Sequence, residues 1–166
     1  MTKTGGLFLT NKKITETAAI AAAAVVLGYL ESLIPLGIPI PGVKLGLSNL
    51  AVLFALYRVG AKNAAAAAAI KVIVSSLLFS GVSAGIYAGC GGFLSYFAMF
   101  FSKKFFSPKF VSISGGIFHN IGQLAAAVII LKSSAALWYM PYLILSGAVT
   151  GFLVGIACEI LLKKLK

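Results

Sequence analysis

The chain contains no aspartate, and its only acidic residues are Glu16, Glu31 and Glu159. Magnesium ions prefer carboxylate oxygens, so enzymes that hold Mg²⁺ through aspartate-rich motifs are excluded. The glycine-rich phosphate-binding loop that ends in Lys followed by Ser or Thr is also missing. ATP hydrolysis through such a loop is therefore excluded as well.

Cysteine is almost as scarce, with Cys90 and Cys158 each placed inside an apolar run. This position predicts buried free thiols that behave as small hydrophobic side chains, with no disulfide and no metal site. The polar N-terminal stretch, residues 1–13, leads into an apolar run without a small-residue cleavage site. It predicts a first helix and not a removed signal peptide.

Charge is rare overall: 10% of the 166 residues are charged, whereas 60% are hydrophobic. A soluble domain of this size cannot bury so much apolar surface, so lipid must solvate much of the chain. In lipid the backbone must satisfy its own hydrogen bonds, which leaves helices or a closed barrel. The apolar runs are long and rich in Ala, Leu, Ile and Gly, which favours helices.

Six such runs predict an all-α polytopic membrane protein that forms one integral membrane domain over residues 1–166. A proline- and glycine-rich segment, residues 35–44, separates the first two, because three prolines in seven residues cannot continue a helix. The second run is short for a full crossing. The expected spans are residues 14–34, 45–57, 63–79, 85–102, 111–131 and 137–162.

The basic residues orient this bundle. With the N-terminus inside, eleven of the fourteen Lys and Arg residues fall in cytoplasmic segments, and only Lys44 and Lys132 fall outside. The positive-inside rule therefore places both termini in the cytoplasm. The net charge of +11 is dispersed in small clusters between apolar runs, so it does not indicate nucleic-acid binding.

Small residues recur at a spacing of four. Ala18 and Ala22 share one face of the first span, and Gly147, Gly151 and Gly155 share one face of the sixth. This spacing allows another helix to approach closely in lipid. For the glycines we expect packing within the bundle, whereas the alanines fit either internal packing or the docking of a partner.

Polar residues at membrane depth are costly and usually face a cavity, a partner or the bundle interior. His119, Asn120 and Gln123 lie within five residues of the fifth span, where they predict either a binding site or interhelical hydrogen bonds. Lys71 lies about nine residues into the third span. It either lines a cavity and meets an anionic or carbonyl group, or extends toward the cytoplasmic surface.

A second group of polar residues lies at the predicted outer end. Lys44 and Asn49 border the start of the second span, and Glu31 lies near the end of the first. The stiff, apolar 35–44 segment suits a lid over a cavity. Glu31 is expected to meet Lys44 or a ligand, or to remain a solvated interfacial carboxylate.

Four segments carry a family resemblance: residues 14–24 (ITETAAIAAAA), 31–35 (ESLIP), 43–49 (VKLGLSN) and 118–123 (FHNIGQ). They resemble a bacterial family labelled heptaprenyl diphosphate synthase component I, or Gx transporter. That family is similar to the substrate-binding S-components of energy-coupling-factor (ECF) vitamin importers. The resemblance covers essentially the whole chain.

The resemblance implies six helices around an outward-facing pocket closed by the 35–44 loop. It implies that Ala18 and Ala22 dock on a membrane-embedded coupling subunit driven by two cytoplasmic ATPase subunits. It also implies a location in the bacterial cytoplasmic membrane.

The resemblance further implies a set of ligand-binding residues. Thiamin-binding relatives have a pocket histidine near the position of His119, and an acidic residue beside a tyrosine in helix four. Here Ser95 precedes Tyr96, and the acid is missing. A neutral amphipathic or anionic ligand, vitamin-like or related to isoprenoids and quinones, is therefore expected in place of a cation. The expected ligand-binding residues are Glu31, Lys44, Asn49, Lys71, Tyr96, His119, Asn120 and Gln123.

The leading hypothesis is thus the substrate-binding subunit of an importer, with no catalytic residues and no cofactor. The rival hypothesis is a non-catalytic membrane accessory subunit of an enzyme that makes prenyl diphosphates or quinones. Catalysis by this chain alone is not expected, because the known all-α prenyl elongation enzymes hold Mg²⁺ through aspartates that are absent here.

Overall fold

The computed structural model describes residues 3–34 and 45–165, with side chains from residue 11 onward. No strand occurs within these residues, which confirms the all-α prediction. The lid expected over residues 35–44, including Lys44, lies outside the described residues. The elements are α1 (Lys3–Ser32), α2 (Leu47–Arg58), α3 (Ala61–Ser75), the π-helical turn η1 (Ser76–Ser80), α4 (Val82–Ser102), α5 (Pro108–Leu131), the 3₁₀ helix η2 (Ser134–Tyr139) and α6 (Met140–Lys164).

Five stretches are long and apolar enough to cross a membrane: Asn11–Ser32, Ala61–Ser80, Val82–Ser102, Pro108–Leu131 and Ser134–Lys164. The twelve-residue α2 is shorter, as the sequence predicted, and rises only about 18 Å against roughly 30 Å of hydrocarbon. Large apolar side chains cover the outer surface of the described bundle. Leu77 is 75% exposed and Ile129 is 74% exposed. Exposure of such large apolar side chains is unfavourable in water but not in lipid. The chain is a multi-pass membrane protein.

The first helix differs most from its expected bounds, because it begins at Lys3 and not near residue 14. Hydropathy detects only the part of a helix that lies in hydrocarbon. The residues before Ile14, which include Lys3, Lys12 and Lys13, continue the same helix. The third span ends in η1, a feature that no hydropathy pattern reveals.

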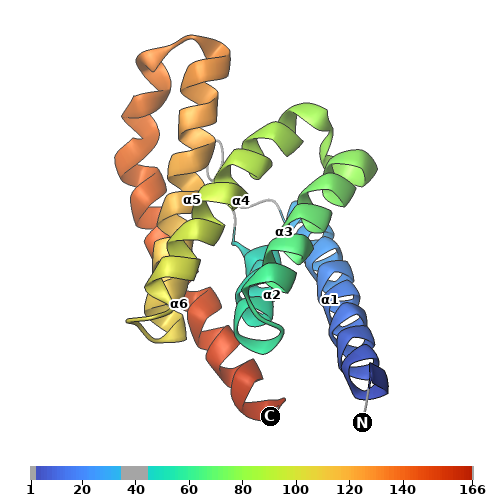
Figure 1. Ribbon diagram of the computed structural model, residues 1–166. Helices are drawn as coiled ribbons and strands as arrows, with labels where there is room; N and C mark the ends of the chain where they lie inside the picture. The colour runs from blue at the N-terminus through green and yellow to red at the C-terminus, as the bar shows by residue number, and fades with distance from the viewer. Residues whose placement is uncertain (1–2, 35–44, 166) are drawn as a thin grey trace.

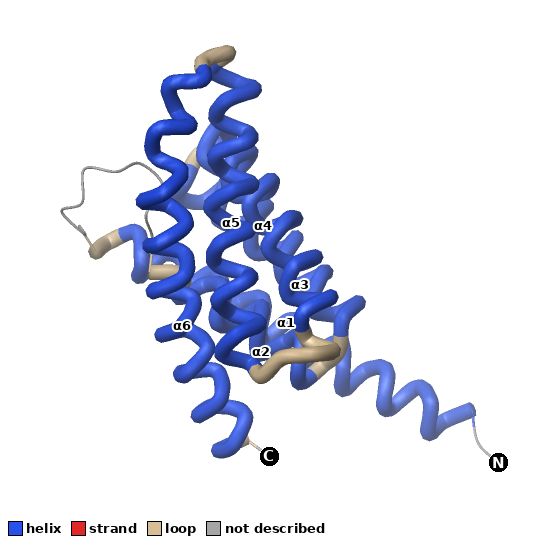
Figure 2. The backbone as a smooth tube through the Cα atoms, turned by 90° about the vertical axis from the view of Figure 1, so that its left-hand side faces the viewer, coloured by secondary structure: helices blue, strands red, loops and turns tan. Residues whose placement is uncertain are grey.

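The helices form two groups (Figure 1). Helices α1, α2 and α3 pack on one another, whereas α4, α5 and α6 pack in sequence, with α5 and α6 side by side (Figure 2). At the end away from the termini, the connection between α3 and α4 lies apart from the connection between α5 and α6 (Figure 1).

Glycines hold the second group together. A Cβ atom on Gly151 would lie 2.6 Å from the carbonyl oxygen of Ser112 in α5, and one on Gly122 would lie 2.6 Å from the carbonyl oxygen of Cys90 in α4. Backbones this close leave no space for a side chain. The expectation that Gly147, Gly151 and Gly155 serve packing within the bundle is confirmed.

The tightest core lies between α2, α5 and α6. Leu53, Leu56, Val111 and Cys158 are almost wholly buried there. The prediction of buried cysteines therefore holds for Cys158 but is wrong for Cys90, which is exposed on α4. The neighbouring Gly91 of α4 faces His119 and Gln123 of α5, whereas the thiol of Cys90 faces outward.

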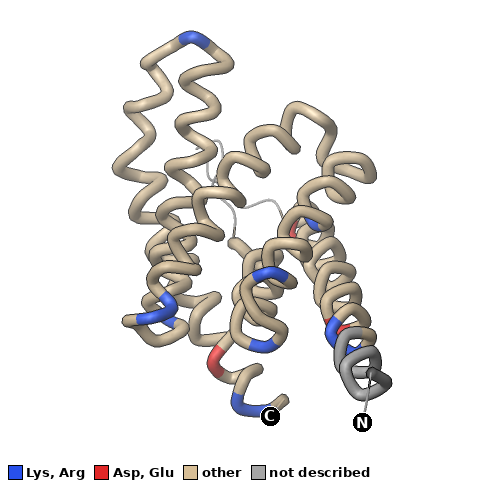
Figure 3. Tube along the Cα trace, viewed as in Figure 1, with Lys and Arg blue, Asp and Glu red and all other residues tan. Residues whose placement is uncertain are grey.

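Basic residues gather at the end of the bundle where both termini lie (Figure 3). Several of these basic residues connect the ends of different helices. Lys109 forms a 3.2 Å salt bridge with Glu159, and Arg58 donates to the carbonyl oxygen of Leu165. Lys103 donates to the carbonyl oxygen of Leu56 and lies over the ring of Tyr57. Burial lowers the pKa of Lys103 from its ordinary value, because it disfavours the charged form. The gathering agrees with the predicted cytoplasmic placement of both termini.

Candidate binding site

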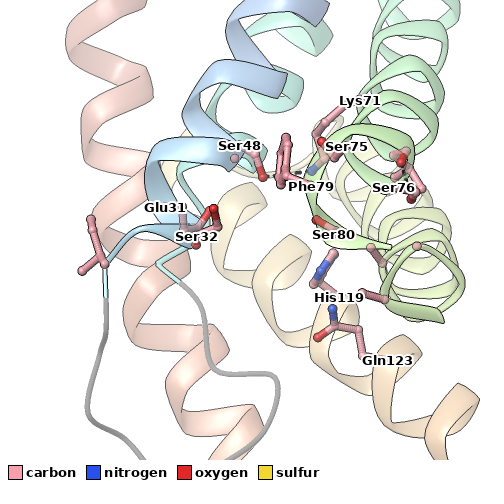
Figure 4. Close-up of a pocket in the computed structure, with 16 residues that line it drawn as sticks. Glu31, Ser32, Ser48, Lys71, Ser75, Ser76, Phe79, Ser80, His119 and Gln123 are labelled. Carbon is pink, nitrogen blue, oxygen red and sulfur yellow. Dashed lines mark hydrogen bonds between the residues drawn. The ribbon is translucent and has the colours of Figure 1, made fainter. Parts of the chain in front are cut away.

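A polar cavity of about 390 Å³ lies where α1, α2, α3, η1, α4 and α5 meet. Figure 4 shows its labelled side chains directed toward a common space. Such a concentration of hydrogen-bonding groups inside an apolar bundle is expensive unless it binds something polar. We call this space the polar cavity. Its polar lining residues are Glu31, Ser32, Ser48, Lys71, Ser75, Ser76, Ser80, His119 and Gln123.

Lys71 is the cation of this cavity. Its side chain is only 9% exposed, and its Nζ donates to Asn49 Oδ1 at 2.8 Å and to Ser48 Oγ at 3.1 Å. Both acceptors belong to α2, so the ammonium is held at the wall of the polar cavity. Of the two alternatives that the sequence left open, the structure favours the cavity over extension toward the cytoplasmic surface.

The serine-rich wall comes from η1, the π-helical turn that ends α3. The N–H of Gly81 donates to the carbonyl oxygen of Ser76, five residues back. This wider turn brings Ser75, Ser76 and Ser80 to the cavity. π-turns within α-helices often mark functional sites. The sequence reasoning missed these serines, although their recurrence at the end of an apolar span was a visible signal.

Glu31 holds the chain segment that leads into α2, next to the polar cavity. Its Oε1 accepts a 2.6 Å hydrogen bond from the backbone N–H of Gly46, just before α2. Gly46 has φ of 78°, a left-handed conformation that favours glycine. Since Glu31 is only 8% exposed, the alternative of a solvated carboxylate is wrong. Glu31 joins α1 to the start of α2 while lining the cavity.

His119 and Gln123 line the cavity from α5, one helical turn apart (Figure 4). Gln123 Oε1 is buried and has no hydrogen-bond partner among the described residues. An unsatisfied buried acceptor is costly, so a ligand donor at this place would be stabilised. The structure thus brings Glu31, Lys71, His119 and Gln123 together, with Asn49 behind Lys71.

Of the three remaining expected ligand-binding residues, Lys44 lies outside the described residues, and Tyr96 and Asn120 are directed elsewhere. Asn120 is buried against α6, where its Nδ2 donates to the carbonyl oxygen of Leu143 at 2.7 Å and to Ser146 Oγ at 3.3 Å. This favours the interhelical alternative for Asn120. The hydroxyl of Tyr96 donates to the carbonyl oxygen of Ala61 at 2.8 Å, which connects α4 to the start of α3.

The neighbours His119 and Asn120 are therefore expected to respond differently to truncation. Asn120→Ala should lower the free energy of unfolding by about 1 kcal/mol, a typical value for an interhelical hydrogen bond in a membrane. His119→Ala should weaken ligand binding with a smaller loss of stability. Thermal unfolding and ligand titration of both variants in detergent would measure this. Equal loss of stability would contradict the assignment.

Ala18 and Ala22 are both exposed, whereas Ala21 and Ala24 on another face of α1 are buried. Packing within the described bundle therefore does not use the Ala18–Ala22 face. Among the described residues, no three His, Cys, Asp or Glu side chains gather as a metal site would require.

Comparison with known proteins gives one finding. The family model described as heptaprenyl diphosphate synthase component I matches residues 20–161. No curated protein and no solved structure shows significant similarity to the chain. The match spans the first to the last helix, including every described residue of the polar cavity.

Proposed function

Because this chain belongs to the heptaprenyl diphosphate synthase component I family, we propose that it is a non-catalytic membrane subunit of a prenyl diphosphate-forming enzyme. In this role it binds an anionic group in the polar cavity. A numbered component implies a partner that supplies the remaining function. The lack of aspartate supports catalysis by that partner, because this chain has few carboxylates for Mg²⁺.

The observation that carries the proposal is Lys71 at the wall of a serine-rich cavity within an apolar bundle. An ammonium donates charge-assisted hydrogen bonds, which are stronger than neutral ones. Serine hydroxyls and the His119 ring supply further hydrogen-bonding groups around it. Phosphate oxygens suit this combination, since they accept several such bonds at once.

One specific observation favours a second function, that of an importer's substrate-binding subunit. The exposed Ala18–Ala22 face of α1 is smooth and faces away from the bundle interior. It fits close docking of another membrane helix. Under this alternative, a coupling subunit and two ATPase subunits are the partners.

Native mass spectrometry of the full chain, isolated with its complexes from its own membrane, separates the two functions. The proposed function predicts a complex that contains a prenyl diphosphate-forming enzyme. A complex with a coupling subunit and ATPases would overturn it in favour of the importer. In that case, replacing Ala18 and Ala22 by leucine should abolish association. Leucine at Ala66 and Ala69, which are exposed on α3, is the matched control.

A further inference from the structure

A second cavity of about 750 Å³ adjoins the first. Its lining is mainly apolar and comes from four elements: Tyr87 of α4, Leu124 and Ala127 of α5, Trp138 of η2 and Leu143 of α6. We call it the apolar chamber. The N-terminal part of α4 and the C-terminal part of α5 form its sides, and η2 closes the hairpin beside it.

The two spaces share residues. Ala84 and Gln123 line both the polar cavity and the apolar chamber. Gln123 therefore lies at their junction, with its buried Oε1 facing no protein donor among the described residues. A cation-bearing polar space thus lies next to an apolar one, with Ala84 and Gln123 between them.

We propose that the two spaces form one site for an anionic amphiphile, an inference that rests on the proposed function. The anionic head lies at Lys71, and the apolar chain occupies the chamber between Tyr87, Ala127 and Trp138. Gln123 Oε1 accepts a hydrogen bond from a protonated phosphate oxygen (P–OH) of the head, on the side of the head next to the chain. The apolar chamber then determines which chains are accepted.

The inference can be tested by varying the length of the ligand's alkyl chain. Each methylene moved from water into an apolar site strengthens binding about fourfold. We expect butyl phosphate to bind the full chain in lipid nanodiscs at least tenfold more tightly than methyl phosphate. Trp138 is the only tryptophan and lines the chamber at its open edge, where it is 84% exposed, so its fluorescence reports ligand that reaches this edge. Its emission should shift with butyl phosphate and not with methyl phosphate.

Substitutions at two alanines of α5 provide a test variant and its matched control. Ala127→Phe places a phenyl ring inside the chamber and should reduce the gain from the butyl chain while methyl phosphate binds as before. Ala125→Phe adds the same ring at an exposed position that lines neither space, and should change neither affinity. Thermal unfolding of both variants establishes that each is folded.

Three results would overturn the inference. If butyl and methyl phosphate bind equally and both depend on Lys71, the apolar chamber is not part of the site, although the proposed function stands. If butyl phosphate binds Lys71→Gln as tightly as it binds the unsubstituted chain, the chamber holds chains independently of the head, as a bilayer lipid would. If neither phosphate shows Lys71-dependent binding, the anion site of the proposed function fails together with the inference.

Discussion

Replacing Lys71 by glutamine is expected to weaken binding of methyl phosphate to the polar cavity roughly 10- to 100-fold. A hydrogen bond to a charged group contributes about 1.5–3 kcal/mol, and the neutral amide retains only a fraction of it. The amide can still donate to Ser48 and Asn49, so the wall of the cavity is expected to keep its shape. Isothermal titration in nanodiscs would measure the affinity.

The matched control is Lys132→Gln. Lys132 is exposed at the C-terminal end of α5 and lies away from the residues that line the polar cavity. The Lys132→Gln substitution removes one positive charge from the chain but leaves the Lys71 ammonium, the donor at the polar cavity, in place. Equal weakening by both substitutions would show that binding follows net charge, and would contradict a specific role for Lys71.

A large loss of stability is expected from Gly151→Ala. Its Cβ would lie 2.6 Å from the carbonyl oxygen of Ser112 and 2.9 Å from the Cα of Ile113. Both are backbone atoms of α5, so no side chain can rotate away, and the two helices must separate. Overpacking of this kind costs about 1–3 kcal/mol. We expect a loss of at least about 2 kcal/mol in the free energy of unfolding, measured by denaturant titration in detergent.

Gly92→Ala is the control for that substitution. A Cβ on Gly92 would meet only Val72 Cγ2 at 3.8 Å, an ordinary van der Waals distance. The same methyl group on a transmembrane helix should therefore be tolerated. A similar loss from both variants would mean that an effect of the added methyl group common to both helices, such as lipid contact, and not the contact between α5 and α6, decides the cost.

Lys71→Gln and Gly151→Ala are both expected to affect the candidate binding site, but in different ways. Lys71 acts at the wall of the polar cavity, whereas Gly151 fixes the position of α5, which carries His119 and Gln123. Separation of α5 from α6 would also alter the apolar chamber, because Leu124 and Leu143 lie on these two helices.

Much of the fold followed from the sequence, because lipid imposes simple rules. Long apolar runs must form helices there, and the distribution of Lys and Arg orients them. These rules predicted the all-α bundle, the short second helix and the gathering of basic residues at one end. They did not locate the start of α1, because a helix that continues into water loses its hydrophobic signal.

The site was predictable only in part. The hydropathy pattern distinguished Glu31, Lys71, His119 and Gln123 as polar residues in or next to apolar spans. All four line the polar cavity. The pattern distinguished Asn120 equally well, yet Asn120 bonds to α6. Adjacent residues on a helix point about 100° apart, so only the packing of α5 distinguishes them.

The sequence by itself determined that this chain is a membrane protein and which polar residues need an explanation, and it predicts how the helices are oriented. Composition and charge suffice for these, because the solvent acts on each residue separately. Only the tertiary structure decided that Lys71 faces a cavity, that η1 adds serines to its wall and that an apolar chamber adjoins it. Those features depend on how distant helices rotate and approach one another, which no single segment encodes.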